Sequence, residues 1–485
     1  MKANDREHGA LGITVLSQDQ IRQIVSASFE ILERIGVDVF SAEAVDLLAD
    51  AGAHVTGRRV RIPSYIVEGA VRTAPSRVVL SSRSGTRKLF LEDRNVYFGL
   101  GADCPFVYDR RGGEKRKVTE RDLAELATIA DCLDNIDFVM PLGLVSDAPI
   151  HSYDVHELVT MIRNTDKPVV FGAVNPGSLL DACEICGIVA GSYEAFMANP
   201  FAAVYAEPAP PLKHVPEGLS QLLLAAEKRF PIVYTPGISA GGTGPVTIAG
   251  SIAQAVAECL SGLTIHQLKK PGSPFVFGGV VTIMDMSRGT YVLGAPELHL
   301  ASAAMAQIAR FLGLPMYSTA GCSDAKVLDQ QAAIESAVSI VVASLSGANL
   351  IHDVGFLDTA MIASAEMMVL SDEVIGMAKR IIRGIEVSSE TLAIDVLERV
   401  GPGGNFVGDE HTYQHFRTED WFPSVLSREG YQVWAEKGSL TMGDKIRKRI
   451  SEILSEHRPL ALPPEVDRAI DAVLKRADAE VQGSS

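Results

Sequence analysis

Three segments, KPVVFGAV (167–174), PFAAVYAEPA (200–209) and FPIVYTPGIS (230–239), are nearly unbroken apolar runs. A strand that alternates apolar and polar residues has one face in water, whereas an unbroken apolar strand is buried on both faces. The three runs therefore predict neighbouring strands of a parallel sheet that is covered by helices.

Five more runs of the same kind occur along the chain: RNVYFGLGAD (94–103), NIDFVMPLGLV (135–145), SPFVFGGVV (273–281), LPMYSTAG (314–321) and NLIHDVGF (349–356). The segments between the runs have the length of helices and are rich in small residues; they are 119–134, 151–165, 178–192, 216–229, 246–268, 296–312 and 329–346. Eight strands that alternate with helices predict an α/β fold, a (β/α)8 TIM barrel, rather than a doubly wound sheet.

The barrel takes residues 91–360 in this interpretation. Residues 1–90 form an N-terminal helical and mixed extension, in which 17–36 has helical spacing and ends at a glycine, a natural helix stop. Residues 361–485 form a C-terminal helical region that packs on the barrel as a cap, with an amphipathic helix near 442–457.

The composition predicts a protein with a large buried core, since 47% of the 485 residues are hydrophobic and 21% are charged. The net charge of −16 opposes nonspecific binding to nucleic acid or to an anionic membrane, because both need a positive field. The N-terminal MKANDREHGALG lacks the apolar segment of a signal peptide, and the uncharged stretch 230–257 is too rich in Gly, Pro, Ser and Thr for a membrane span. We expect a soluble, cytoplasmic protein.

Six cysteines in a chain of this length do not indicate a disulfide framework. Cys183 and Cys186 form the only CxxC motif, within an apolar helical segment that has no second pair and no ligand-spaced histidine. We expect both as buried thiols and expect no metal site. The sequence has no HExxH motif, so nothing in it supports a metallohydrolase of that class.

In a barrel of this type, the functional site lies at the carboxyl ends of the strands. The candidate substrate-binding residues there are Tyr97, Asp103, Tyr205, Glu207, Tyr234, Phe277, His352 and Phe356. Aromatic faces and carboxylates around an apolar cavity suit a quaternary ammonium ion, at roughly 0.5–2 kcal/mol for each well-placed ring. The alternative is ordinary packing: we expect at least two of the five rings to be barrel core, and His352 could be a core histidine.

The turn after the seventh strand, within YSTAGCSDAKVLDQQAAIE (317–335), gathers polar residues ahead of a helix. Ser323 or Asp324 could cap the helix that starts near Asp329. Ser323, Asp324 and Lys326 could also form the rim of the mouth, where a partner protein docks. We expect both roles together, with the Lys326 side chain pointing outward.

Three stretches carry a resemblance to a known family: ILERIGVDVFSAEAVDLLADAGAHV (31–55), the turn region 317–335, and GPGGNFVGDEHTYQHFRTEDWFPSVLSREGYQVWAEKG (401–438), which is the most specific. Over nearly the whole chain the sequence resembles the trimethylamine methyltransferase superfamily. The resemblance implies a (β/α)8 barrel that moves a methyl group from a methylated amine to the cobalt of a separate corrinoid protein. It implies no permanently bound cofactor, because the corrinoid (cobalamin) comes with that partner, and it leaves homo-oligomer formation open.

The trimethylamine enzymes of this family carry a pyrrolysine in the barrel, whereas this chain contains only the twenty standard residues. The branch without pyrrolysine is associated with quaternary amines such as glycine betaine, proline betaine and carnitine. The expected function is therefore methyl transfer from a quaternary amine, glycine betaine first, to the Co(I) of a corrinoid protein. Two alternatives stay open: a betaine-binding or sensing barrel without transfer, and another barrel enzyme, such as a lyase, that uses Asp324, Lys326 or Asp329 as acid/base groups.

Overall fold

Eight parallel strands form the centre of the molecule in a computed structural model, which describes residues 11–109 and 113–479. They are β6 (Tyr97–Leu100), β9 (Ile136–Phe138), β10 (Val169–Gly172), β11 (Ala202–Ala206), β13 (Ile232–Tyr234), β15 (Phe275–Gly278), β18 (Met316–Thr319) and β19 (Leu350–Val354). Their order is β10-β11-β13-β15-β18-β19-β6-β9, and a parallel bridge between Val139 and Val169 joins the two end strands. Each strand lies within one of the eight apolar runs, so the (β/α)8 TIM barrel is confirmed. Most of the stretch considered above for a signal peptide falls outside the described residues.

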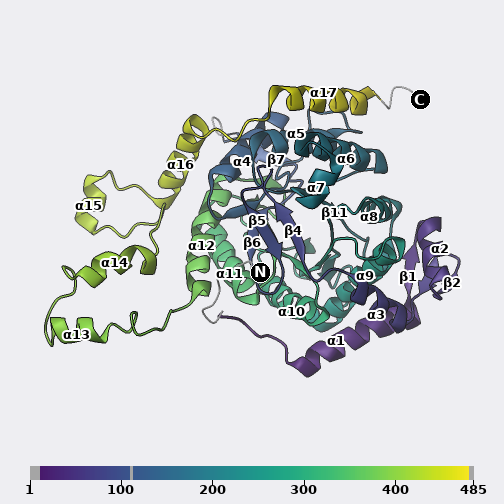
Figure 1. The fold of residues 1–485 in the computed structure, drawn as a ribbon, viewed down its shortest axis with the longest axis horizontal. Helices are drawn as coiled ribbons and strands as arrows, with labels where there is room; N and C mark the ends of the chain where they lie inside the picture. The colour runs from purple at the N-terminus through teal and green to yellow at the C-terminus, as the bar shows by residue number, and fades with distance from the viewer. Residues whose placement is uncertain (1–10, 110–112, 480–485) are drawn as a thin grey trace.

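A ring of helices surrounds the strands (Figure 1). The connecting helices are α4 (Glu120–Cys132), α5 (Tyr153–Asn164), α6 (Pro176–Ala190), α8 (Pro216–Lys228), α9 (Ile248–Lys269), α10 (Pro296–Leu312) and α11 (Gln330–Ser346), with the short α7 (Tyr193–Ala198) after α6 and with α12 (Ala365–Arg383) after the last strand. Polar caps begin several of them: Asn175 accepts a hydrogen bond from the Ser178 amide, and Asp329 from the Ala332 amide. Cys183 and Cys186 are buried on α6, where burial raises the pKa of both thiols, as expected for structural cysteines.

Among the described residues, one helix is long and apolar enough to cross a membrane by length and composition. It is α9, and 83% of its most apolar window is buried inside the structure. Helix α9 packs against α1, α3 and α8 and against the barrel strands. Its apolar character is therefore explained by its place in the core.

The N-terminal extension covers the side of the barrel and its amino end. Helix α1 (Gln18–Glu30) continues as a π-helical turn, Ile31–Ile35, and the stop falls at Gly36, whose φ of 77° favours glycine. A small sheet follows, made of β1 (Val37–Val39), β2 (His54–Thr56), β3 (Arg59–Arg61) and the later β12 (Lys213–His214), with α2 (Ala42–Asp50) and α3 (Ser64–Thr73) beside it. The hairpin β4 (Val78–Ser81) and β5 (Lys88–Leu91) bonds to the amino ends of the strands, as in the 2.7 Å bond from the Ser81 amide to the Pro200 carbonyl.

Two small sheets extend the barrel wall beyond the carboxyl ends of the strands. One contains β14 (Gly237–Ala240), β16 (Val280–Asp285) and β17 (Thr290–Tyr291), which lie after β13 and β15. The other contains β7 (Phe106–Tyr108), β8 (Lys115–Lys117), β20 (Phe356–Leu357) and β21 (Ile362–Ala363), which lie after β6 and β19. Both sheets are formed by the loops that follow the barrel strands, so they surround the mouth of the barrel with a wall.

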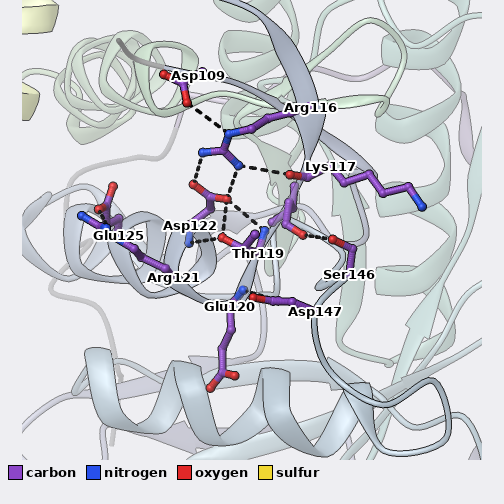
Figure 2. Close-up of polar contacts among 11 residues, drawn as sticks. Asp109, Arg116, Lys117, Thr119, Glu120, Arg121, Asp122, Glu125, Ser146 and Asp147 are labelled. Atoms are coloured by element: carbon purple, nitrogen blue, oxygen red, sulfur yellow. Dashed lines mark hydrogen bonds and ion pairs between the residues drawn. The ribbon is translucent and has the colours of Figure 1, made fainter. Parts of the chain in front are cut away.

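Arg116 fixes the second small sheet to the start of α4 (Figure 2). Its guanidinium donates to both carboxylate oxygens of Asp122, at 2.6 and 2.8 Å, and to Asp109 at 3.2 Å. Burial alone would raise the pKa of Asp122, but the hydrogen bonds from Arg116 and Thr119 lower it to about 2. The bidentate pair stays charged at neutral pH and holds one wall of the mouth in place.

The C-terminal region returns to the barrel through two amphipathic helices. Helix α16 (Met442–Glu456) packs on α4 and α12, and α17 (Pro464–Ala479) packs on α5 and α6. Between α12 and α16 the chain makes an excursion with α13 (Ile394–Val400), α14 (Glu410–Glu419) and α15 (Tyr431–Glu436), which projects from the body in Figure 1. One cluster of buried apolar side chains runs from Ile21 to Leu474, so the three expected segments share a core. We propose the divisions at residues 90 and 360 as boundaries within one packed unit.

Glu258 gives a test of the packing around α9. This carboxyl is fully buried; one oxygen accepts hydrogen bonds from the Leu212 amide and Gln254, both at 2.8 Å, and burial raises its pKa to about 7. Because its pKa in the folded chain lies above the unfolded value of 4.5, the stability from the neutral form is complete below that value and is lost as pH rises through 7. Glu258→Gln should therefore raise the free energy of unfolding at pH 8 by about 1–3 kcal/mol.

Urea unfolding at pH 5 and pH 8 measures the effect, with the exposed Glu194→Gln on α7 as the control. The same pH dependence in wild type and Glu258→Gln would contradict the assignment.

Candidate active site

Three rings converge inside the barrel. Tyr317 on β18 stacks on His352 of β19, with ring centroids 4.3 Å apart and planes 12° apart. Tyr205 on β11 approaches both from across the barrel, at 5.9 Å from Tyr317 and 6.5 Å from His352. Successive side chains in a strand point to opposite faces, and these three occupy inward positions of their strands. The interior therefore presents aromatic surface near the carboxyl ends.

Asp353 orients the histidine. It has φ of 82°, rare for a residue with a side chain, at a point where the pairing of β19 with β6 shifts register. Its carboxylate contacts Nδ1 of His352 and accepts a hydrogen bond from the Thr319 hydroxyl. Nε2 of His352 is buried without a hydrogen-bond partner among the described residues. The carboxylate accepts a proton held on Nδ1 and fixes the orientation of the ring, so Nε2 is left free to hydrogen-bond a ligand.

Two carboxylates stand beside the rings. Asp103 follows β6 with φ of 67°, and Glu207 follows β11 and accepts a hydrogen bond from the Tyr205 hydroxyl at 3.2 Å. Both side chains are accessible to solvent, yet the protein around them removes enough bulk water to raise the pKa of each, that of Asp103 to about 6. The two carboxylates also repel each other, which adds to the rise for Asp103. Accessible groups that are so enclosed lie in a cavity.

Two further tyrosines lie within electrostatic range of these carboxylates. Burial, followed by the charges of Asp353, Cys322 and Glu207, raises the pKa of Tyr291 on β17. Burial and the charge of Asp103 raise the pKa of Tyr153, at the start of α5, to about 12. Rings and carboxylates together give a wall with negative potential and polarisable faces, which attracts a cation without a hydrogen-bonding proton. The unpartnered Nε2 of His352 adds a hydrogen-bonding position to this wall.

The structure brings Asp103, Tyr205, Glu207 and His352 together, but it places three of the predicted rings elsewhere. Tyr97 is the first residue of β6, at the amino end, where its hydroxyl accepts a hydrogen bond from the β5 hairpin. Tyr234 and Phe277 face the helices, since Tyr234 bonds to His214 at 2.7 Å and Phe277 shares a face with Phe275, which packs on His266 of α9. Tyr234 and Phe277 are therefore the rings that belong to the packed core of the barrel.

Phe356 lies at the mouth, where its ring occupies the space over Gly101 that any larger side chain would fill. It belongs to β20, in the small sheet beyond β19.

The turn after β18 is a structural joint. Asp329, rather than Ser323 or Asp324, caps α11. Ser323 donates to Glu335 at 2.5 Å, while Asp324 accepts from the Leu293 and Gly294 amides at 2.8 and 2.9 Å. The Asp324 bonds tie the loop before α10 to the turn, and the Ser323 bond ties the turn to α11. The capping alternative is wrong for Ser323 and Asp324, because Ser323 bonds to the Glu335 side chain inside α11 and Asp324 bonds to the loop before α10.

Lys326 is 67% exposed beside Asp358, at 3.5 Å. Near it, a hollow of about 510 Å³ is lined by Val246, Met284, Met286 and Asp324 among others, beside the mouth and not over the rings. The outward position of Lys326 agrees with a place at the rim.

Residue-level reasoning from the sequence missed Tyr317, Tyr291 and Tyr153. Tyr317 lies within the apolar run 314–321, two residues before Thr319 at the end of β18, so the period of two could have identified it. Tyr291 and Tyr153 belong to a loop hairpin and to a helix start, and the sequence carries no signal that brings either to the mouth.

Comparison with known proteins gives a consistent set of relatives. The family model described as Trimethylamine methyltransferase (MTTB) matches residues 4–482. The glycine betaine methyltransferase of Desulfitobacterium hafniense (strain Y51) is 30% identical over 469 residues, which are 96% of this chain and 98% of that one. The trimethylamine methyltransferase MttB of Methanosarcina barkeri (strain Fusaro / DSM 804) is 30% identical over 481 residues, which are 97% of this chain and 96% of that one.

A solved structure supports the fold. The crystal structure of the Methanosarcina barkeri monomethylamine methyltransferase aligns with a TM-score of 0.52 at 12% identity, over 95% of this chain and 87% of that one. Identity this low supports the architecture alone.

The cavity should bind a small cation in a pH-dependent way. Tetramethylammonium, titrated calorimetrically, should bind about 5- to 10-fold more weakly at pH 5 than at pH 8, because Asp103, with a pKa of about 6, loses its charge in that interval. In Asp103→Asn the affinity at pH 8 should fall toward the low-pH value, with a smaller pH dependence left to Glu207. Equal affinity at both pH values in the wild type would contradict the electrostatic role.

Proposed function

This chain belongs to the trimethylamine methyltransferase family, and from that premise we propose that it transfers a methyl group from a quaternary amine to a corrinoid protein. Glycine betaine is the first substrate to test, and the acceptor is the Co(I) centre of a separate partner protein. The observation that carries the proposal is the cluster of Tyr205, Tyr317 and His352 with two carboxylates in one enclosed mouth. That set of groups suits a zwitterion with a trimethylammonium head.

A quaternary substrate fits this chain better than trimethylamine. The relatives include proteins named for each substrate at equal identity, so overall similarity does not choose between them. The sequence contains only the twenty standard residues and therefore lacks the pyrrolysine of the trimethylamine enzymes. A tertiary amine leaves poorly unless it is first activated, whereas a quaternary ammonium leaves as a neutral amine.

The proposed reaction balances without an acid or a base. The electron pair of Co(I) forms the new bond to the methyl carbon, and the pair of the carbon–nitrogen bond stays on nitrogen. Glycine betaine then departs as dimethylglycine, and the cobalt becomes methyl-Co(III). The protein has to hold the cation, aim one methyl group out of the barrel and exclude water.

Each group of the mouth has a proposed role in that task. Tyr205 and Tyr317 present ring faces to the trimethylammonium group, while Glu207 and Asp103 compensate its charge. Nε2 of His352, whose ring Asp353 fixes at Nδ1, is the proposed contact for the substrate carboxylate, to which it donates when the ring carries both protons. One methyl group then faces the opening of the barrel.

The lyase alternative finds little support. Of its three candidate groups, Asp324 is saturated by two backbone amides and the Thr359 hydroxyl, and Asp329 caps α11. Lys326 is exposed and lies beside Asp358. None of these contacts places an acid/base pair at the ring cluster.

Substrate assignment is tested with purified enzyme, a corrinoid protein in the Co(I) state and a panel of glycine betaine, proline betaine, carnitine and trimethylamine. Conversion to methyl-Co(III), followed by absorbance, should occur with glycine betaine and not with trimethylamine. Conversion with proline betaine or carnitine alone would keep the proposed reaction and replace glycine betaine as the substrate. Calorimetric binding without conversion across several corrinoid proteins would support a sensing barrel instead.

Ring and charge roles are tested by substitution. Tyr205→Leu should weaken betaine binding about 2- to 30-fold, the loss expected for one ring contact. Glu207→Gln should weaken it by a similar factor. Phe277→Leu is the matched control, because it also removes a ring from a barrel strand but on the face toward the helices. Equal losses in Phe277→Leu and Tyr205→Leu would count against the cage.

Lys326 tests the docking rim. Lys326→Ala should raise the KM for the corrinoid protein several-fold and leave the affinity for betaine unchanged. An exposed charge at the rim acts on association with the partner protein and not on the cavity. The exposed Lys448→Ala on α16 serves as the control. A large loss of betaine affinity in Lys326→Ala would contradict its place outside the cavity.

A further inference from the structure

The excursion between α12 and α16, residues 384–441, exposes an unusual amount of apolar surface. We call this segment the arm; it projects from the body in Figure 1. Helices α14 and α15 have no buried residue, and α13 has only Val396. The exposed apolar side chains are Ile385, Val387, Leu392, Ile394, Leu397, Phe406, Val407, Tyr413, Phe422, Leu426, Tyr431, Val433 and Leu440. Large exposed apolar surface is unusual on a soluble monomer and marks an interaction site.

The base of the arm is fixed to the barrel. The carboxylate of Glu373 on α12, which is buried, accepts hydrogen bonds from the amides of Ser424, Val425 and Leu426 at 3.0–3.1 Å. Trp421 packs on Gly376 one turn further along α12, within 3.1 Å of the space where a larger side chain would lie. Two outer lobes, 385–415 and 427–440, therefore extend from a rigid attachment.

The lobes lack the packing that stabilises short helices. Their helices have 7, 10 and 6 residues, and helices this short need a packed face to persist. Each large apolar side chain left in water forgoes roughly 1.5–3 kcal/mol of burial. A pre-formed arm with a bare apolar surface indicates that another surface covers it.

The body offers such a surface next to the root of the arm. Helices α11 and α12 pack side by side, and each exposes an apolar pair at i, i+4 spacing: Ile334 with Val338, and Met377 with Ile381. The arm leaves the body at the end of α12, so one side of the molecule carries both an apolar projection and an apolar face.

We propose that the arm packs on the α11–α12 face of a second copy of this chain, and that the second arm packs on the first in return. A two-fold pair of identical contacts buries both surfaces at once and leaves no open end. A transient partner would leave the arm bare between encounters, whereas a second copy is always present at the same concentration. Permanent, apolar contacts of this kind are typical of obligate homo-oligomers. The proposal does not depend on the proposed reaction.

The mass in solution tests it. Wild type at micromolar concentration should sediment as a multiple of the 51.9 kDa chain. Val407→Asp/Tyr431→Asp, at residues that are 83% and 78% exposed, should lower the mass at least two-fold, while the circular dichroism spectrum loses no more helix than the short helices of the arm contain. Tyr65→Asp on α3, 59% exposed and away from the arm, should leave the mass unchanged.

Cross-linking identifies the surfaces. A bismaleimide added to a mixture of Val407→Cys and Ile334→Cys chains should join two chains, and each variant alone, or the wild type, should give far less product. A monomeric wild type overturns the proposal, as does a Val407→Asp/Tyr431→Asp variant that keeps the wild-type mass. A monomer that gains mass only when a corrinoid protein is added would assign the arm to that partner and would also overturn it.

Discussion

Alternation of side chains in the eight parallel strands decides which groups meet at the mouth. Tyr205, Tyr317 and His352 form one cluster because all three occupy inward positions in their strands. Paired residues of neighbouring strands point to the same face, so the register sets the inward positions of each strand in turn. Tyr205 pairs with Val233 of β13, and Thr319 pairs with His352 of β19. A shift of one residue would send the rings into the helix layer and bring Tyr234 inside. The site thus depends on the register that closes the barrel.

The mouth has a negative potential because its two carboxylates are not offset by a lysine or an arginine in the described part of the chain. Asp103 and Glu207 have no neighbouring lysine or arginine among the influences on their pKa, and only His352 and the Tyr205 hydroxyl offset the burial of Glu207. Carboxylates kept together in an enclosed site destabilise the empty protein, because each raises the cost of ionising the other. A bound permanent cation relieves that cost, and it is a ligand that needs no proton from the protein. The same arrangement that opposes stability therefore favours a quaternary ammonium.

Sequence reasoning reached the fold and only part of the site, for a physical reason. Unbroken apolar runs identify strands buried on both faces, and the eight runs coincide with the eight strands. The face toward which each ring points depends on register, so Tyr234 and Phe277 were indistinguishable in sequence from Tyr205. Asp353 required the positive φ that only coordinates reveal, and Tyr291 lies on β17, a loop strand that no apolar run marks in the sequence. Local capping was equally ambiguous, since Asp324 and Asp329 both precede α11 and only Asp329 caps it.

The block 401–438, which carries the most specific family resemblance, is explained by architecture rather than chemistry. Its aromatic and basic side chains contact one another and α12: Arg428 lies 5.6 Å from the Trp421 ring, and Trp434 donates to the Leu440 carbonyl at 3.0 Å. These contacts shape the arm and fix its base, on the outside of the barrel. The cavity at the strand ends does not depend on these contacts. The arm does, because they hold its shape for the proposed docking of a second chain. Dense histidine, arginine and tryptophan content, which in isolation suggests a catalytic segment, is here what a short apolar arm requires to stay folded.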